Sequence, residues 1–352
     1  MKSILMNFKK YLPYWFCTFE LIVLTTLIYN QNIISYGLSQ LKGQLNIIIN
    51  ARPINEVLAD PGFPDTLKSK LILIQEIKAF AIDSIGITNS NNYNTVFDQK
   101  GKSILWVLSA SEPYGLKAYE WSFPFLGKVS YKGFFDLNKG KIELNALKSL
   151  HYDAEISQVG AWSTLGLFND PILSNMLKLD EGRLANLIIH ELTHGTLYVK
   201  GDVDFNENLA SFIGDQGALR FLAYKYGNGS AEMKKYLESN RDEKVYDKYI
   251  IQSAKRLDSL YHSIKNEKRE TKEELKNQMM QDIISGASKL DLYEKEKYAR
   301  ITKKIKTHKN AFFMSFLRYS AKQHDFENEL HLTFNGDLKE YLHYLKTIYP
   351  SI

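Results

Sequence analysis

The pentapeptide His190-Glu-Leu-Thr-His194 constrains the fold more than any other feature of this sequence. It ends an apolar run that begins at Leu184, and Asp180 and Glu181 precede this run, where the helix dipole favours acidic side chains. The pattern predicts a helix. Residues four apart lie on one face of a helix with Cβ atoms about 5–6 Å apart, so both imidazoles can bind one metal ion.

Glu191 lies next to the histidine face without joining it. From this position its carboxylate can accept a proton from a water molecule that a metal activates, which makes Glu191 the candidate general base. The five residues alone are also compatible with a histidine pair packed in the core beside a surface glutamate. The metal interpretation therefore depends on a further ligand elsewhere in the chain.

A catalytic zinc site needs a third protein ligand and one open position. The residues after His194 open as a loop and then become helical, with Asp204 as the expected cap and Glu207 in the first turn. Small residues follow at helical spacing: Ala210, Ser211, Gly214, Gly217 and Ala218. They let this helix approach the first one closely, which would bring Glu207 to the metal. The other candidates for the third ligand are Asp202, Asp204 and Asp215.

Composition narrows the kinds of site that the chain can build. Cys17 is its single cysteine, so neither an internal disulfide nor a thiolate metal cluster is possible, and a metal must bind His, Asp or Glu. The 45 basic and 40 acidic residues give a net charge of +5, which is too small and too evenly spread to indicate a nucleic-acid partner. The 352 residues fit one large domain or a two-lobed one.

The N-terminus resembles a membrane anchor. Three lysines at positions 2, 9 and 10 precede an apolar run over residues 11–29, which is long enough to cross a bilayer as a helix. No small-residue cleavage site follows, so we expect residues 1–32 to be an uncleaved anchor. Positive charge before the span places the N-terminus in the cytoplasm and residues 33–352 outside it.

Hydrophobic periodicity predicts an α+β fold, mostly helical, for residues 33–352. We expect helices over residues 33–90, a strand-rich segment with a small sheet over residues 95–150, the active-site helices over residues 180–222 and a helical C-terminal lobe over residues 223–352. Alternation over residues 128–135 predicts one strand, and Asn138-Lys-Gly140 predicts a turn.

The pair His190-Glu-x-x-His194 and Asn206-Glu-x-x-Ala210 resembles the motifs of the gluzincin clan of metallopeptidases. Further segments are similar to a bacterial family of predicted aminopeptidases: residues 51–60, 121–124, 131–136, 161–166, 168–172, 198–202 and 205–210. The resemblance covers about residues 35–222 well and extends more weakly to residues 309–311 and Tyr319.

This resemblance implies a zincin-like fold, a Zn²⁺ ion held by His190, His194 and Glu207, and hydrolysis of peptide or protein substrates with Glu191 as the base. Because the family is bacterial, the expected N-terminal anchor would lie in a bacterial cell membrane, although this chain lacks the lipidation motif that often begins members of the family. The chain departs from the gluzincin pattern, because it lacks the Gly-x-Met-Glu-Asn segment that binds the substrate amine in typical gluzincin aminopeptidases. A membrane-anchored endopeptidase, a zinc hydrolase of another amide and a non-catalytic metal-binding scaffold therefore remain alternatives to an aminopeptidase.

Two further parts of the site are expected from this chemistry. A hydrogen-bond donor should stabilise the oxyanion, and the candidates are Tyr131, Tyr198 and Tyr319. Zincin peptidases similar to this chain hold peptide beside an edge strand, whose unpaired backbone groups bind an extended chain of many sequences. Residues 128–135 are the candidate for that strand.

Overall fold

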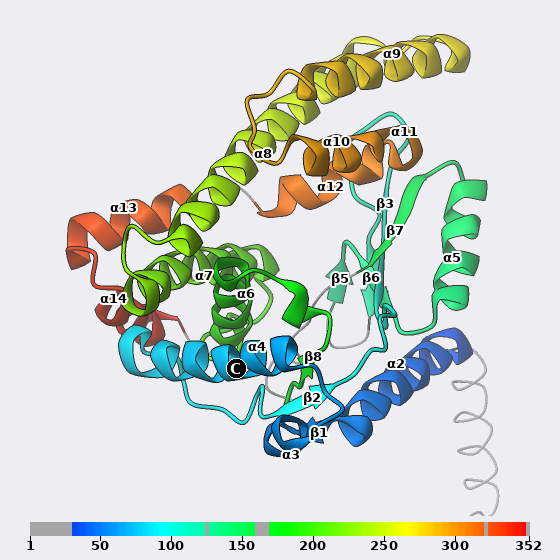
Figure 1. Ribbon diagram of the computed structural model, residues 1–352. Coiled ribbons are helices and arrows are strands. Elements are labelled where there is room, and N and C mark those ends of the chain that lie inside the picture. Colours follow the sequence, from blue (N-terminus) through cyan, green and yellow to red (C-terminus); the bar gives the residue numbers. More distant parts are fainter. Residues whose placement is uncertain (1–29, 124–126, 159–168, 320–322, 350–352) are drawn as a thin grey trace, which may run out of the picture. The chain divides into compact units, whose positions relative to one another are not determined.

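The computed structural model describes residues 30–123, 127–158, 169–319 and 323–349, with the backbone alone for residues 318–319 and 323–324 (Figure 1). The chain divides into two compact units, Met1–Asn46 and Ile47–Ile352. Helix α2 (Gln31–Asn50) crosses this boundary, and every other described element belongs to the second unit. The division into residues 1–32 and 33–352 stays a prediction.

Helices dominate the second unit. Its α-helices are α3 (Ile54–Ala59), α4 (Asp65–Phe80), α5 (Leu137–Ser149), α6 (Glu181–His194), α7 (Val203–Tyr226), α8 (Ala231–Ser263), α9 (Arg269–Ala287), α10 (Lys295–Lys303), α11 (Ile305–His308), α12 (Asn310–Tyr319), α13 (Gln323–Phe334) and α14 (Leu338–Ile348). A π-helix, η1 (Ala81–Ile85), extends α4, and a 3-10 helix, η2 (Met176–Lys178), precedes α6.

The strands of the described residues are short and form three small sheets. They are β1 (Arg52–Pro53), β2 (Thr95–Phe97), β3 (Trp106–Ser111), β4 (Trp121–Phe123), β5 (Gly127–Val129), β6 (Lys132–Phe134), β7 (Asp153–Gln158) and β8 (Ile172–Leu173). Strand β3 pairs antiparallel with both β6 and β7, β2 lies between β1 and β8, and β4 pairs with β5. The predicted α+β class, mostly helical with a small sheet component, is confirmed.

Two local expectations for residues 128–138 are wrong. The single strand expected over residues 128–135 is divided, because β5 and β6 belong to different sheets. The turn expected at Asn138 is the first turn of α5, where Asp136 caps the helix by accepting a hydrogen bond from the Asn138 amide at 2.9 Å. Gly140 then faces Phe134 and Ile156 closely, which explains a glycine inside this helix.

Two clusters of buried apolar residues form the core of the second unit. The first contains the inner faces of α4, α6, α7 and α14, and the second gathers α8, α9, α10 and α12. Helix α8, which has 33 residues, contributes Met233 and Tyr236 to the first cluster and Tyr246 and Leu257 to the second. Figure 1 shows α8 running from the α6–α7 pair toward α9.

Helix α6 begins at a cap and buries most of its length. The Asp180 carboxylate accepts a hydrogen bond from the Arg183 amide at 3.0 Å, which satisfies one free N–H group of the first turn. Leu184, Ile188 and Ile189 then pack in the first cluster. The expected amphipathic helix over this segment is therefore present, and the two histidines of the motif lie in its last two turns.

Helix α7 lies very close to α6. A Cβ atom added to Gly214 would lie 3.0 Å from the Asn186 carbonyl oxygen and 3.2 Å from the His190 Cβ. One added to Gly217 would lie 2.9 Å from the Ile189 Cδ1. The small residues therefore do what their spacing predicts. The cap of α7 differs from the expectation, because Asp202, not Asp204, accepts the Phe205 amide hydrogen bond, and Glu207 falls in the second turn.

Among the described residues, no helix combines the length and the apolar composition needed to cross a membrane. A span needs about 20 mostly apolar residues, and α2 has 20 residues but includes Gln40, Lys42 and Gln44. This finding contradicts the expected single-pass location in a bacterial cell membrane, and with it the extracytoplasmic placement, so we correct both. Residues 11–29, the expected anchor, lie outside the described residues.

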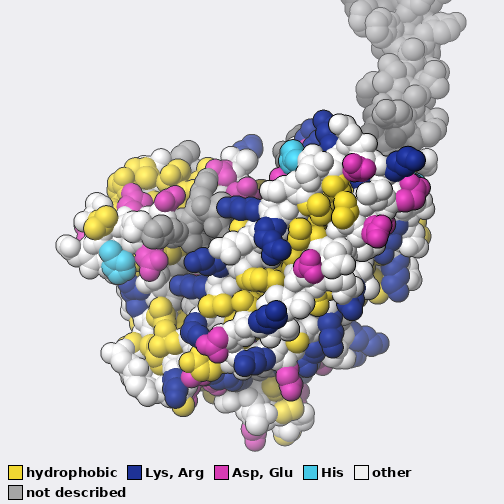
Figure 2. Space-filling view, turned by 90° about the horizontal axis from the view of Figure 1, so that it is seen from above, with side chains coloured by type: hydrophobic (Ala, Val, Ile, Leu, Met, Phe, Trp, Pro, Cys, Tyr) yellow, Lys and Arg dark blue, Asp and Glu magenta, His cyan; other side chains and the backbone are white. Residues whose placement is uncertain are grey.

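The face of the molecule in Figure 2 carries Lys and Arg side chains interspersed with Asp and Glu side chains. No single basic surface fills this view. The expected absence of a nucleic-acid partner stays a prediction.

Substitution of Gly182 by alanine should destabilise the protein. The new Cβ atom would lie 2.6–2.7 Å from the Cβ, Cγ and Cδ2 atoms of Tyr236, so α8 would have to move away from α6. We expect a loss of about 1–3 kcal/mol in the free energy of unfolding, measured by denaturant titration. The control is Gly229→Ala, whose added Cβ meets nothing within 4 Å. Equal stability of the two variants would contradict the described α6–α8 contact.

Candidate metal centre

His190 and His194 on α6 and Glu207 on α7 face one another. The His190 Nε2 lies 3.7 Å from the Glu207 Oε2, and the His194 Nε2 lies 3.6 Å from the Glu207 Oε1. One candidate ligand atom from each residue lies within 4.8 Å of the other two, and no further group of this kind occurs among the described residues. Two segments separated in sequence thus meet at the spacing that one metal ion requires.

These distances fit a metal ion better than hydrogen bonds. Nitrogen–oxygen hydrogen bonds are usually 2.7–3.2 Å long, and both separations here exceed that range. Ligand atoms on a tetrahedral zinc ion, with bonds of about 2.0–2.1 Å, lie about 3.3 Å apart. A shift of a few tenths of an ångström would therefore complete the coordination. The described residues offer two imidazoles and one carboxylate, a donor set that suits zinc.

The surroundings of His194 support the same interpretation. Its side chain is 6% exposed, and its Nδ1 is buried without a hydrogen-bond partner among the described residues. A metal ion bound at the Nε2, the atom that faces Glu207, would leave this Nδ1 unpaired, so the Nδ1 is not an argument for the metal. Burial, with a smaller contribution from His190, lowers the pKa of His194 to about 4. The ring is thus neutral near pH 7, the form that binds metal.

His190 lies in a different electrostatic environment. Burial alone would lower its pKa, but the carboxylates of Glu207 and Glu191 outweigh that effect and raise it. The two histidines therefore differ in proton affinity although they share one face of α6, because several carboxylates act on His190 and only Glu207 acts on His194. A divalent cation at this position would compete with a proton for the His190 ring.

Glu191 is buried next to the three candidate ligands. Burial raises its pKa to about 7, and repulsion from Glu207 and Asp170 adds to that effect while His190 opposes it. A general base works best when its pKa lies near the operating pH. Asp170 lies in the segment 168–172 that resembles the aminopeptidase family, and its effect on Glu191 becomes visible only in the folded chain.

The loop between α6 and α7 is fixed by Asn206, the residue before Glu207. The Val199 amide donates to the Asn206 Oδ1 at 2.8 Å, and the Asn206 Nδ2 donates back to the Val199 carbonyl oxygen at 2.8 Å. Asn206 is 1% exposed, so this two-way contact excludes water. It holds the start of α7 and hence the Glu207 side chain. The sequence motif Asn206-Glu207 draws attention to Asn206, but it does not show that this side chain binds the Val199 backbone.

The three aspartates proposed as alternative ligands lie outside this group. Asp202 caps α7, and Asp204 is exposed in its first turn. Asp215 accepts hydrogen bonds from the Asn186 Nδ2 at 2.7 Å and from the Tyr236 hydroxyl at 2.8 Å. Each aspartate is therefore engaged elsewhere or lies away from the two histidines. Glu207 remains as the candidate for the third ligand.

The candidate oxyanion donors are less clearly placed. The Tyr198 ring centroid lies 6.2 Å from that of His194, and burial raises the pKa of its hydroxyl, which keeps it a donor. Tyr131 is half-buried in the bend between β5 and β6. The Tyr319 side chain lies outside the described part of the structure. The oxyanion role of all three residues stays a prediction.

Comparison with known proteins gives a family. A family model described as "Putative aminopeptidase" matches residues 35–349, and this range includes all three candidate ligands and Glu191. No curated protein and no solved structure matches the chain. The family expected from the sequence is confirmed at this level. Because the match extends over most of the 352 residues, the chain belongs to the "Putative aminopeptidase" family.

Proposed function

We propose that this protein is a zinc-dependent peptidase with a zincin-like fold, in which His190, His194 and Glu207 bind the metal. The observation that carries the proposal is the meeting of their three ligand atoms within 4.8 Å of one another at the α6–α7 contact. The family match supports peptide bonds as the substrate, and its description favours removal of N-terminal residues.

The mechanism needs few groups beyond these. When bound, zinc supplies a Lewis acid for the scissile carbonyl and lowers the pKa of a water molecule. Glu191 accepts the proton of the attacking water, because its carboxylate is adjacent to the ligand face and its pKa of about 7 suits proton transfer near neutrality. As the carbon–nitrogen bond breaks, Glu191 donates that proton to the leaving amine and returns to its starting state.

The packing of the two helices supports the zincin-like part of the proposal. One helix carries the histidines and the base, the other carries the glutamate, and glycines at 214 and 217 bring their backbones together. The site is thus built on rigid helices. Such elements hold ligands within the small tolerance that metal binding and proton transfer require.

Metal content tests the ligands. The purified protein should bind about one zinc ion per chain, and His190→Ala or His194→Ala should abolish stoichiometric binding, because two ligands cannot hold the ion tightly. Glu207→Ala should weaken binding. Elemental analysis after dialysis measures this, with Asp204→Ala as the control, since Asp204 is exposed on the same helix. Full zinc content in both histidine variants would overturn the site.

Peptide hydrolysis tests the base. Glu191→Gln should keep the zinc and lower kcat by about a hundred- to ten-thousandfold, because it removes a proton acceptor but no ligand. A matched control is Glu181→Gln, in the first turn of the same helix and paired with Lys70 at 2.6 Å. Near-normal turnover in Glu191→Gln with zinc bound would mean that another group takes the proton.

A further inference from the structure

Residues 227–230 join α7 to α8 as a turn whose central residues, Asn228 and Gly229, are both exposed. The Ser230 amide donates to the Gly227 carbonyl oxygen at 3.2 Å, which closes a β-turn. A β-turn uses the carbonyl of its first residue and the amide of its last, so the amide of its third residue is left over. The Gly229 amide accordingly has no acceptor in the described part of the chain.

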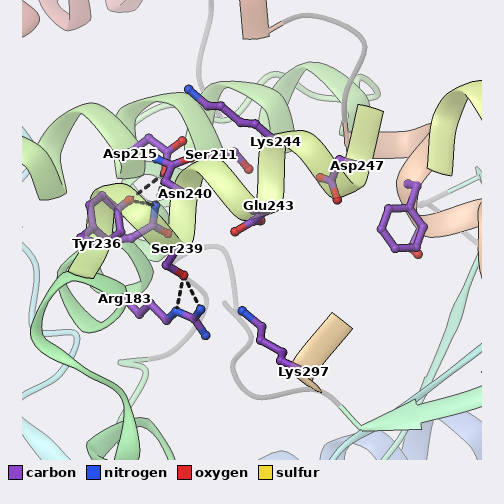
Figure 3. Close-up of a pocket in the computed structure, with 13 residues that line it drawn as sticks. Arg183, Ser211, Asp215, Tyr236, Ser239, Asn240, Glu243, Lys244, Asp247 and Lys297 are labelled. Carbon is purple, nitrogen blue, oxygen red and sulfur yellow. Dashed lines mark hydrogen bonds between the residues drawn. The ribbon is translucent and has the colours of Figure 1, made fainter. Parts of the chain in front are cut away.

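Both ends of this turn are held in place. The Gly227 amide closes the last turn of α7, and the Ser230 Oγ accepts a hydrogen bond from the Met233 amide at 3.1 Å and so caps α8. Further along α8, the Tyr236 hydroxyl donates to Asp215 on α7 at 2.8 Å, as Figure 3 shows. The turn is therefore fixed between two packed helices, while its centre is open to solvent.

An asparagine followed by a glycine can react within the chain. The side-chain carbonyl carbon of asparagine lies within reach of the next backbone nitrogen, so no second molecule has to be brought to it. A side chain on the next residue hinders this approach, and glycine has none. A Cβ atom added to Gly229 would meet nothing within 4 Å, so other parts of the protein also leave its nitrogen accessible.

The sequence contains one other Asn-Gly pair, Asn335-Gly336 after α13, which serves as an internal comparison. The Gly336 amide donates to the Leu330 carbonyl oxygen at 3.0 Å, and the Arg220 Nη2 donates to the Gly336 carbonyl oxygen at 2.8 Å. The Gly336 nitrogen can therefore attack only after this segment opens locally. The Gly229 nitrogen needs no such opening.

We propose that Asn228 is a modification site, at which the Gly229 nitrogen attacks the asparagine side chain and releases ammonia. A bond forms between the Gly229 nitrogen and the Asn228 Cγ, and the bond between this Cγ and its Nδ2 breaks. The proton of the Gly229 amide leaves with the Nδ2 as part of ammonia. Water then opens the succinimide ring at either carbonyl, which gives aspartate or isoaspartate at position 228. The reaction is a hydrolysis and needs no oxidant.

The two products affect the turn differently. Aspartate adds a negative charge shortly before the Ser230 cap, near the end of α8 where the helix dipole favours it. Isoaspartate directs the main chain through the former side chain and inserts a methylene group between Gly227 and Ser230, the two residues whose hydrogen bond closes the turn. Either product alters the start of the helix that carries Tyr236 and changes none of the candidate metal ligands.

Incubation of the purified protein at mildly alkaline pH, followed by peptide mapping with mass spectrometry, tests the proposal. Conversion at Asn228 should be about tenfold faster than at Asn335, which corresponds to about 1.4 kcal/mol of local opening around Gly336. In a denaturant that unfolds the chain the two rates should become equal, because both sites are then the same dipeptide. Equal rates in the folded protein, or an unequal ratio that persists in denaturant, would overturn the assignment to the turn.

The variant Gly229→Ala tests the attacking nitrogen. Its methyl group should slow conversion at Asn228 to the rate of Asn335 in the folded protein or below, without a clash that disturbs the fold. The control is Gly37→Ala, whose added Cβ also meets nothing within 4 Å and which should leave the rate at Asn228 unchanged. Unchanged conversion in Gly229→Ala, with the fold intact by circular dichroism, would overturn the proposal. Neither measurement depends on zinc or on peptide hydrolysis.

Discussion

The close approach of α6 and α7 is the contact on which the rest of the site depends. Gly214 lies so near the Asn186 carbonyl and the His190 Cβ that any larger side chain would separate the helices. The separation of Glu207 from the histidines is set by the same contact, and the Asn206–Val199 hydrogen bonds fix where α7 starts. Ligand geometry is therefore a consequence of backbone packing, not of flexible side chains adjusting to an ion.

The close packing of α6 and α7 places several ionisable side chains next to one another. Two imidazoles and two carboxylates lie together in a mostly buried site, and their pKa values diverge: His194 falls to about 4 while Glu191 rises to about 7. Such a cluster costs free energy to bury, and a divalent cation would offset the cost of its carboxylates. The same helix buries the apolar side chains of Ile188, Ile189 and Leu192 in the first cluster. Helix α6 therefore stabilises the fold and also holds the ionisable side chains close together.

Sequence reasoning succeeded where the information is local. On a helix, the spacing of His190 and His194 places both on one face, and the small residues of α7 allow a close approach to another helix. The structure shows both features. It failed where a choice depends on distant contacts. Asp202 and Asp204 are equally good caps in sequence, and the Asn206 clamp on Val199 needs the folded loop.

Helix α8 links the two clusters of buried apolar residues through contacts in its first half. Tyr236 packs against Gly182 and donates to Asp215 near the metal centre, whereas Tyr246 packs in the second cluster and bonds Thr302 at 2.9 Å. The Tyr236 hydroxyl thus ties α8 to Asp215 on α7, so substitutions on α8 can disturb the α6–α7 contact without changing any of the candidate metal ligands.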